Sequence, residues 1–249
     1  MRKIIMIQRA ACFSPGSVEK DWAILHAVGE LLRDRGDDVR YVPETLLTDD
    51  LESDVYLSMG RLADTLDFLR QRSGHALVIN NADSIRRASR INLDSLMREK
   101  KIPVAPAKGD CGYWIKRSEV GTHKMDDVVF AEDEKTCKEF VRQMQRQGSK
   151  VLVTAHVRGA HLKFYRVLGT PFFYFLFPEP GPHFPFDASA LQKDADTVAG
   201  EIGMQVYGGD CIVREDGSYV IIDFNDWPSF ASCREEAARA IASLVPFSE

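Results

Sequence analysis

The C-terminal part of the chain contains three oxygen-bearing side chains whose spacing suits a metal ion. In the segment VYGGDCIVREDGSYVIIDFNDWPSF (206–230), Asp216 and Gly217 lie between two apolar runs, a strong signal for a two-residue β-hairpin turn. With that turn Asp210 lies opposite Asp223, with Cβ atoms about 4.5–5.5 Å apart. Asn225, two residues further on, points to the same side of the hairpin.

Two carboxylates held this close repel each other unless one is protonated or a cation lies between them. Two carboxylates and an amide oxygen suit a hard divalent ion such as Mg²⁺, which usually brings phosphate oxygens with it. The alternative is that both aspartates are solvated on an exposed hairpin face. Apolar residues on the same face argue against that exposure: Ile212, Tyr219 and Ile221. The opposite face is expected to pack into a core through Cys211, Val213, Val220, Ile222 and Phe224.

The composition is that of an ordinary soluble globular protein. The 249 residues are 45% hydrophobic and 28% charged, enough to bury a full core in one large domain or two small ones. A net charge of −5 gives no general reason to bind nucleic acid or an anionic membrane. No apolar run approaches the roughly 18 residues that span a membrane. Five widely spaced cysteines without a Cys-x-x-Cys pair favour a reducing cytoplasm.

The hydrophobic pattern changes near residue 104. Before that point strand and helix signals alternate, which predicts a small parallel sheet with covering helices. Its strands are expected at 3–7, 39–42, 55–57 and 76–79, and its helices at about 18–35, 62–70 and 83–100 with a break near Arg90.

Strands follow one another more often after residue 104, which predicts an α+β region with antiparallel pairing. Strands are expected at 113–116, 128–131, 151–156, 162–168 and 172–177, besides the hairpin, and helices at 133–147 and 187–202, with a last helix opened by Ser232-x-x-Glu235. We therefore predict an α/β domain at 1–104 and an α+β domain at 105–249.

The order of these features resembles the ATP-grasp superfamily across nearly the whole chain. The linker segment 78–106 is similar to that of ribosomal-protein glutamate ligases, with Arg90 where a lysine is common. WIKRSEVGTHKMDDVVF (114–130) resembles the inositol-trisphosphate kinase branch, with Lys116 as the strand lysine and His123 as the histidine. Asp210, Asp223 and Asn225 match the superfamily's magnesium ligands. The resemblance thus implies an ATP-grasp fold with a small N-terminal parallel α/β domain.

The same resemblance assigns the nucleotide hinge to the segment 151–169. Adenine would bond the backbone of Ala155, His156 and Val157, although relatives usually have a glutamate where Ala155 stands. Lys163 is the best candidate for the next phosphate-contacting residue, with Arg166 as the alternative. Together with Arg90, Lys116 and Lys163, these hinge residues form the expected nucleotide site.

One departure concerns the arginine that ATP-grasp ligases generally carry after this strand. The stretch FFYFLFPEPGPHFPF (172–186) contains no arginine or lysine, and His183 is its only potential cation. Either another residue such as Arg234 takes that role, or the chemistry differs.

The resemblance implies an ATP-dependent ligase with one or two Mg²⁺ ions, Mn²⁺ being an alternative, that activates a carboxylate for attack by an amine. The expected catalytic residues are Lys163, Arg166 and His123. A small-molecule kinase and a non-catalytic ATP-binding protein are the alternatives. The second substrate, a small molecule or peptide, has only scattered candidate contacts that could equally be loop or cap residues: Arg9, Ser14, Arg61 and the Ser58-Met59-Gly60 turn.

Overall fold

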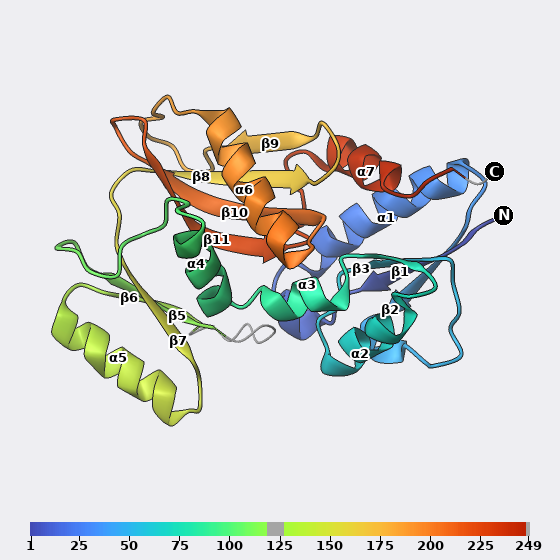
Figure 1. The fold of residues 1–249 in the computed structure, drawn as a ribbon, viewed down its shortest axis with the longest axis horizontal. Coiled ribbons are helices and arrows are strands. Elements are labelled where there is room, and N and C mark those ends of the chain that lie inside the picture. The colour runs from blue at the N-terminus through green and yellow to red at the C-terminus, as the bar shows by residue number, and fades with distance from the viewer. Residues whose placement is uncertain (119–126, 248–249) are drawn as a thin grey trace.

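The computed structural model describes residues 1–118 and 127–247. These residues form three β-sheets with helices packed between and around them (Figure 1). The two ends of the chain lie close together at one end of the molecule, where Arg2 Nη2 donates a hydrogen bond to the carbonyl of Phe247 at 3.1 Å.

The N-terminal sheet is parallel throughout, in the order β2-β1-β3-β4, as the alternating pattern predicted. Its strands are β1 (Lys3–Gln8), β2 (Asp38–Pro43), β3 (Val55–Ser58) and β4 (Leu77–Ile79). The helices of this region are α1 (Val18–Asp34), α2 (Ala63–Arg72), α3 (Ala82–Arg87) and α4 (Arg90–Glu99), with 3₁₀ turns at Ala11–Phe13 and Glu44–Leu46. The predicted break near Arg90 is confirmed, because Ser89 caps α4 by accepting a hydrogen bond from the Asn92 N–H.

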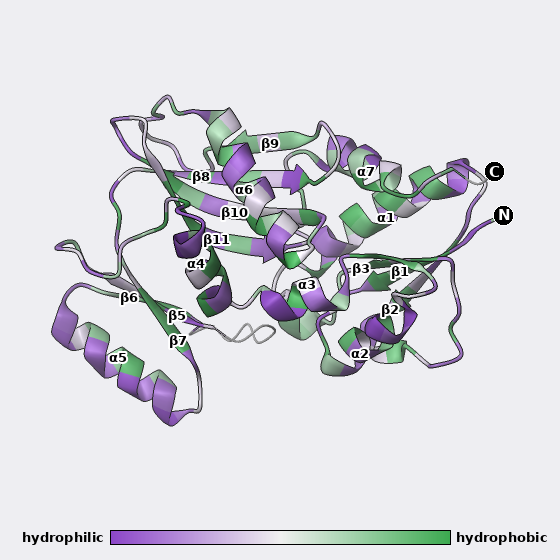
Figure 2. Cartoon of the chain, in the orientation of Figure 1, coloured by the Kyte–Doolittle hydropathy of each residue, from purple (hydrophilic) through white to green (hydrophobic). Residues whose placement is uncertain are grey.

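A small antiparallel sheet, in the order β6-β5-β7, follows the linker. It comprises β5 (Tyr113–Arg117), β6 (Val128–Ala131) and β7 (Val151–Ala155), covered on one face by α5 (Glu134–Arg146). Helix α5 alternates between hydrophobic and hydrophilic residues (Figure 2), and it buries Cys137 and Met144 against Ile115 of β5. Side chains alternate along a strand, so Lys116 lies on the uncovered face.

The third sheet is also antiparallel, in the order β11-β10-β8-β9. Its strands are β8 (Ala160–Val167), β9 (Phe173–Leu176), β10 (Val206–Val213) and β11 (Tyr219–Asp226), and α6 (Ala188–Ile202) packs on one face. The order of strands and helices expected from the sequence is therefore present.

The β10–β11 hairpin has a different turn from the one predicted. Arg214 N–H donates to the carbonyl of Ser218 at 2.8 Å, so the loop contains three residues, ending with Gly217 at φ +81°. A type I turn followed by a left-handed glycine is the usual geometry of such loops. The register nevertheless pairs Asp210 with Asp223, as predicted.

A β-bulge explains why Asp210 still pairs with Asp223 although the turn differs from the predicted one. The register shifts between Asp210 and Cys211, because Asp210 pairs with Asp223 while Cys211 pairs with Ile221. Ile222 is thus the extra residue, and it cancels the extra residue in the loop. The predicted faces beyond the bulge are consequently wrong: Tyr219 and Ile221 join Cys211 in the core.

The last helix, α7 (Arg234–Ser243), begins after Cys233, whose side chain makes no capping bond, so the predicted start at Ser232 is wrong. Helix α7 packs against α1, and one hydrophobic cluster combines residues of both ends of the chain with the fully buried Trp227. The division at residue 104 therefore stays a prediction. Within the described residues, no helix is both long and apolar enough to cross a membrane.

Candidate nucleotide and metal site

Asp210 lies at the centre of a group of charged side chains on the outer face of the β8–β10 pair. Its Oδ1 accepts hydrogen bonds from Lys163 Nζ and His161 Nε2, both at 2.7 Å. Burial raises the pKa of Asp210, but these two hydrogen bonds outweigh burial and hold the pKa below its ordinary value. The hydrogen bond to Asp210 in turn raises the pKa of His161. Asp210 is therefore ionised and already neutralised by protein cations.

Asp223 has its own cation. Arg90 Nε lies 3.5 Å from Asp223 Oδ1, and the Arg90 Nη1 donates to the carbonyl of Arg117 at 2.9 Å. Asn225 Nδ2 lies 3.5 Å from Asp223 Oδ2, which places the predicted third ligand beside the second. The start of α4 thus reaches both β11 and the end of β5.

Lys116 joins the small sheet to the hairpin. Its Nζ donates a hydrogen bond to the carbonyl of Ile222 at 2.5 Å. Ile222 is the bulge residue, which has no partner in the β10–β11 pairing. Burial lowers the pKa of Lys116, and Asp223 offsets this only in part. Four predicted residues from distant segments, namely Arg90, Lys116, Asp210 and Asp223, are thus brought together.

The donor set fits a divalent ion. Two carboxylates and an amide oxygen lie along one face of the hairpin, which is the oxygen-only chemistry that Mg²⁺ prefers. Among the described residues no group of three or more His, Cys, Asp or Glu side chains could hold a metal, so Asn225 is needed to complete the set. Contacts with Lys163, His161 and Arg90 offset the repulsion between the Asp210 and Asp223 carboxylates. This repulsion therefore does not itself require a metal ion.

A small cavity lies beside Arg90 and Asp223. It measures about 20 Å³ and is bounded by α4, β7 and β11, with Arg90 and Asp223 at its polar side. Its wall includes Leu152 and Thr154, which share the uncovered face of the small sheet with Lys116. The cavity has room for about one water molecule in this conformation.

The predicted hinge residues are engaged by the loop that precedes β5. Ala155 N–H donates to the carbonyl of Pro106 at 2.7 Å, and His156 N–H donates to that of Gly112 at 2.8 Å. These two N–H groups are therefore occupied, which leaves carbonyl groups and Val157 as the hinge positions open to a base. A Cβ on Gly109 would lie 2.8 Å from the Ala155 Cβ, so the loop packs closely against the position where the resemblance leads one to expect a glutamate.

Arg166 does not belong to the site. Its guanidinium forms two hydrogen bonds of 2.8 Å with Asp196 on α6 and also binds the carbonyls of Val167, Thr170 and Phe172. It lies on the α6 face of the sheet, opposite Lys163, because the two differ by an odd number of positions along β8. This placement does not favour the expected catalytic role of Arg166, whereas Lys163 contacts Asp210. His123 lies outside the described residues.

A larger cleft of about 510 Å³ is lined by two of the predicted metal ligands, Asp210 and Asn225. The hairpin and β8 contribute Lys163, Tyr165, Gly208, Asp210, Asn225 and Asp226. The N-terminal region contributes Arg9, Ser14, Lys20, Asp21 and Arg61, so three of the scattered candidates for the second substrate do line one cavity.

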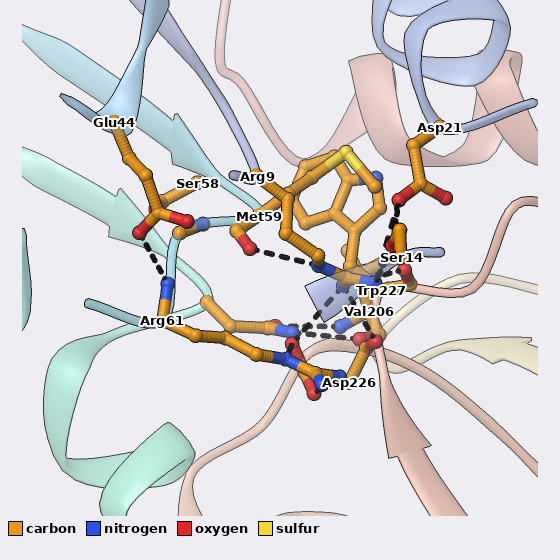
Figure 3. Close-up of polar contacts among 12 residues, drawn as sticks. Arg9, Ser14, Asp21, Glu44, Ser58, Met59, Arg61, Val206, Asp226 and Trp227 are labelled. Atoms are coloured by element: carbon orange, nitrogen blue, oxygen red, sulfur yellow. Dashed lines mark hydrogen bonds and ion pairs between the residues drawn. The ribbon is translucent and has the colours of Figure 1, made fainter. Parts of the chain in front are cut away.

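Arg9, Arg61 and Asp226 form a buried ionic cluster at the inner end of this cleft (Figure 3). Arg61 binds the Asp226 carboxylate through Nε and Nη2, and Arg9 Nη2 lies 3.3 Å from Asp226 Oδ2. Burial raises the pKa of Asp226, but Arg61 and Arg9 outweigh this and hold the pKa low. Burial and the neighbouring Arg61 lower the pKa of Arg9.

Sequence reasoning missed His161 and Asp226. His161, Lys163 and Tyr165 alternate along β8, and this period-2 pattern of polar side chains was the available signal for a shared face. Asp226 ends an apolar strand directly after Asn225, and a charge in that place signals burial with a partner.

Neither His183, in the segment 172–186, nor Arg234 takes the place of the missing arginine. His183 stacks on Phe177 with ring centroids 4.3 Å apart, while Arg234 begins α7 and does not line the cleft. Among the described residues, the cationic side chains that line the cleft are Arg9, Lys20, Arg61 and Lys163.

No protein-family model matches the chain, and no curated protein matches it in sequence. Solved structures do match along nearly the whole chain. The D-alanyl-alanine synthetase A of Vibrio cholerae has a TM-score of 0.72 at 10% identity, covering 97% of this chain and 93% of that one. A RimK domain ATP-grasp protein from Sphaerobacter thermophilus has a TM-score of 0.67 at 16% identity, covering 98% and 99%.

The D-cycloserine synthetase DcsG is similar to the same extent, with a TM-score of 0.65, 14% identity and coverage of 97% and 99%. Identities this low establish the fold alone. The three sheets, their strand orders and these full-length matches show that the chain has the ATP-grasp fold.

Proposed function

We propose that the protein is an ATP- and Mg²⁺-dependent ligase that activates a carboxylate as an acyl phosphate and transfers the acyl group to an amine. The observation that carries this proposal is the position of Asp210, Asp223 and Asn225. Asp223 lines the small cavity beside the small sheet, whereas Asp210 and Asn225 line the 510 Å³ cleft. A nucleotide on the side of the small cavity would direct its phosphates past these residues toward a substrate in the cleft.

Each charged residue has a role in this arrangement. Asp210, Asp223 and Asn225 would hold Mg²⁺, one or two ions, and the metal supplies neutralisation of the charge shared by the β- and γ-phosphates. Lys163 would exchange its bond to Asp210 for one to a phosphate oxygen, and Arg90 would do the same from Asp223. Lys116 would bind phosphate once the sheets part and its bond to Ile222 opens. Phosphoryl transfer needs this positioning and charge neutralisation more than covalent help.

The reaction takes place in two steps. A substrate carboxylate oxygen attacks the γ-phosphorus, the bond to the β,γ-bridging oxygen breaks, and ADP leaves. The amine then attacks the acyl carbon, loses a proton, and displaces inorganic phosphate. The cleft would hold both acceptors beside Lys163, and its volume suits a small molecule or the end of a peptide.

The similar structures support ligation over other chemistry. Two of them are described as D-alanyl-alanine synthetase A and D-cycloserine synthetase, and a third as an ATP-grasp ligase complexed with a minimal precursor. All five cysteines of this chain are free, which supports the expected cytoplasmic location.

A small-molecule kinase is the second candidate, and two features favour it. Aspartate occupies position 223, and no lysine or arginine stands at 172–186 to steady an acyl phosphate. His183, the only potential cation there, stacks on Phe177. A nucleotide-binding protein without catalysis is the third candidate, supported by the same gap.

Separate assays of ADP and inorganic phosphate distinguish these functions. The protein is screened with ATP, Mg²⁺ and panels of carboxylates, amines and hydroxylated acceptors. A ligase forms ADP and phosphate in equal amounts only with both carboxylate and amine, and transfers ¹⁸O from the carboxylate to the phosphate. ADP without free phosphate would establish the kinase, and Mg²⁺-dependent binding without turnover would favour the binding protein.

A further inference from the structure

The N-terminal sheet is joined to the base of the metal-binding hairpin by buried polar contacts at both of its strands. At β10, the Asn80 side chain accepts from the N–H groups of Gln205 and Val206 at 2.9 and 2.8 Å, and donates to the Val206 carbonyl at 2.7 Å. At β11, the Asp226 carboxylate is held by Arg9 and Arg61. The hairpin end opposite the turn is therefore fixed by residues of the N-terminal region.

Arg9 also fixes the backbone that follows the metal ligands. Its Nη2 donates to the carbonyls of Asp226 at 3.2 Å and Trp227 at 3.1 Å, while Nε donates to the carbonyl of Met59 at 3.1 Å. Trp227 has φ +36°, a left-handed conformation that a bulky residue rarely adopts unless its surroundings impose it. The conformation directly after Asn225 is thus set by Arg9, which follows β1 and is held by Met59, the residue after β3.

Arg61 is itself held in place. The buried Glu44 carboxylate accepts hydrogen bonds from the N–H groups of Arg61 and Leu62 at 2.6 and 2.8 Å, and from that of Ala10 at 2.6 Å. These bonds fix the turn from which Arg61 extends and the residue after Arg9; Figure 3 shows the bond between Glu44 and Arg61.

The charges within the cluster compensate one another. Arg9 and Arg61 meet Asp226, and the buried Asp21 lies 3.6 Å from Arg9 and is bound by Ser14. With Glu44 the cluster has two positive and three negative groups, so it has no excess positive charge to attract an anionic substrate. The guanidinium groups of Arg9 and Arg61 donate hydrogen bonds to protein oxygens, which favours a positioning role over substrate binding.

We propose that Arg9 and Arg61 are positioning residues that act through Asp226 to hold Asn225 and Asp223 in the geometry that binds Mg²⁺. Asp226 is next to Asn225 in β11, so a displacement of Asp226 is transmitted to the amide oxygen through one peptide unit. The N-terminal sheet then forms both a wall of the substrate cleft and the support of the metal site. This inference rests on the proposed Mg²⁺-dependent nucleotide binding.

The test is a Mg²⁺ titration of ATP-dependent thermal stabilisation in Arg61→Lys. Lysine keeps the positive charge but cannot make the two-point bond to Asp226, so a purely electrostatic effect is excluded. Arg72→Lys is the matched control, since Arg72 is similarly buried in the same region and binds the carbonyls of Asp49, Leu51 and Phe68.

We expect Arg61→Lys to raise the Mg²⁺ concentration for half-maximal stabilisation about tenfold or more, the usual effect of removing support behind a metal ligand. Binding of ATP in EDTA should remain unchanged. Arg72→Lys should lower the melting temperature but leave the Mg²⁺ midpoint within about twofold of wild type, since it supports no ligand. Ser14→Ala, which removes the hydroxyl that accepts from Arg9 and donates to Asp21, should shift the midpoint in the same direction by a smaller factor.

A Mg²⁺ midpoint unchanged in both Arg61→Lys and Ser14→Ala overturns the inference, even if both variants are less stable. So does an equal shift in Arg72→Lys, because the effect would then follow stability alone. The wild-type titration distinguishes failure of this inference from failure of the proposed function. If wild-type protein shows no Mg²⁺-dependent stabilisation by ATP, the proposed function fails first.

Discussion

At the level of single residues, the structure changes the reason for expecting a metal at Asp210 and Asp223. Repulsion between the carboxylates suggested an ion from the sequence, but Lys163, His161 and Arg90 already offset that repulsion. The case for Mg²⁺ now depends on the convergence of Asn225 with both carboxylates. In the proposed function Lys163 and Arg90 would instead bind phosphate oxygens.

Asp223→Asn tests the metal ligand set. Losing one carboxylate relieves repulsion with Asp210 but weakens the contact with Arg90, so we expect the stability without nucleotide to change by less than about 1 kcal/mol. Mg²⁺-dependent stabilisation by ATP should be largely lost. Thermal melts with and without Mg²⁺ measure both, and Asp67→Asn, at a distant surface ion pair, is the control. A badly destabilised protein that still responds to Mg²⁺ would make Asp223 structural.

Arg166→Met tests the placement of Arg166. Breaking the buried contacts with Asp196 and three carbonyls should destabilise the fold by about 3 kcal/mol. Affinity for Mg²⁺-ATP, measured calorimetrically well below the melting temperature, should stay within about twofold of wild type, because Arg166 faces α6. Loss of nucleotide affinity without loss of stability would support its predicted phosphate contact.

At the level of elements, the sequence predicted the strands and helices well because their periodicity is local. The Asp210–Asp223 pair was predicted although the turn was not, because the three-residue loop and the bulge at Ile222 compensate each other. Neither feature leaves a clear signal in one sequence. The contacts of Ala155 with Gly109 could not be predicted either, since they depend on how a loop folds back on the hinge.

Ala155→Glu tests the hinge. It restores the carboxylate found in relatives, but the side chain meets Gly109, so we expect destabilisation by about 1–3 kcal/mol from overpacking. Denaturant unfolding measures this, with Ala155→Ser as a near-isosteric control that should change stability by less than about 1 kcal/mol. An Ala155→Glu protein as stable as wild type would mean that the loop does not occupy this space in solution.

At the level of the whole molecule, the two predicted domains share more than a linker. Helix α7 packs on α1, and Trp227 and Phe230 belong to the same hydrophobic cluster as Ile4 and Leu25. Contacts between residues this far apart in the chain cannot be predicted from the periodicity of a single sequence. Fold class was predictable from the order of elements, whereas this shared core was not.

A fragment of residues 1–104 tests the shared core. Without α7 and Trp227 it exposes the apolar side of α1, so we expect no cooperative thermal transition by circular dichroism. The full chain should show one. A fragment that melts cooperatively on its own would support the predicted boundary as a true domain border.

The central claim is that the hairpin trio binds ATP through Mg²⁺, and thermal unfolding of the wild-type protein tests it most directly. The melting temperature is measured with ATP and EDTA and with ATP and Mg²⁺. At about 100 times the dissociation constant, ligand adds about 2.7 kcal/mol, which corresponds to a rise of about 5–10 °C for a chain of this size. We predict that rise with Mg²⁺ and a clearly smaller one with EDTA. Melting curves that coincide under the two conditions would contradict the account.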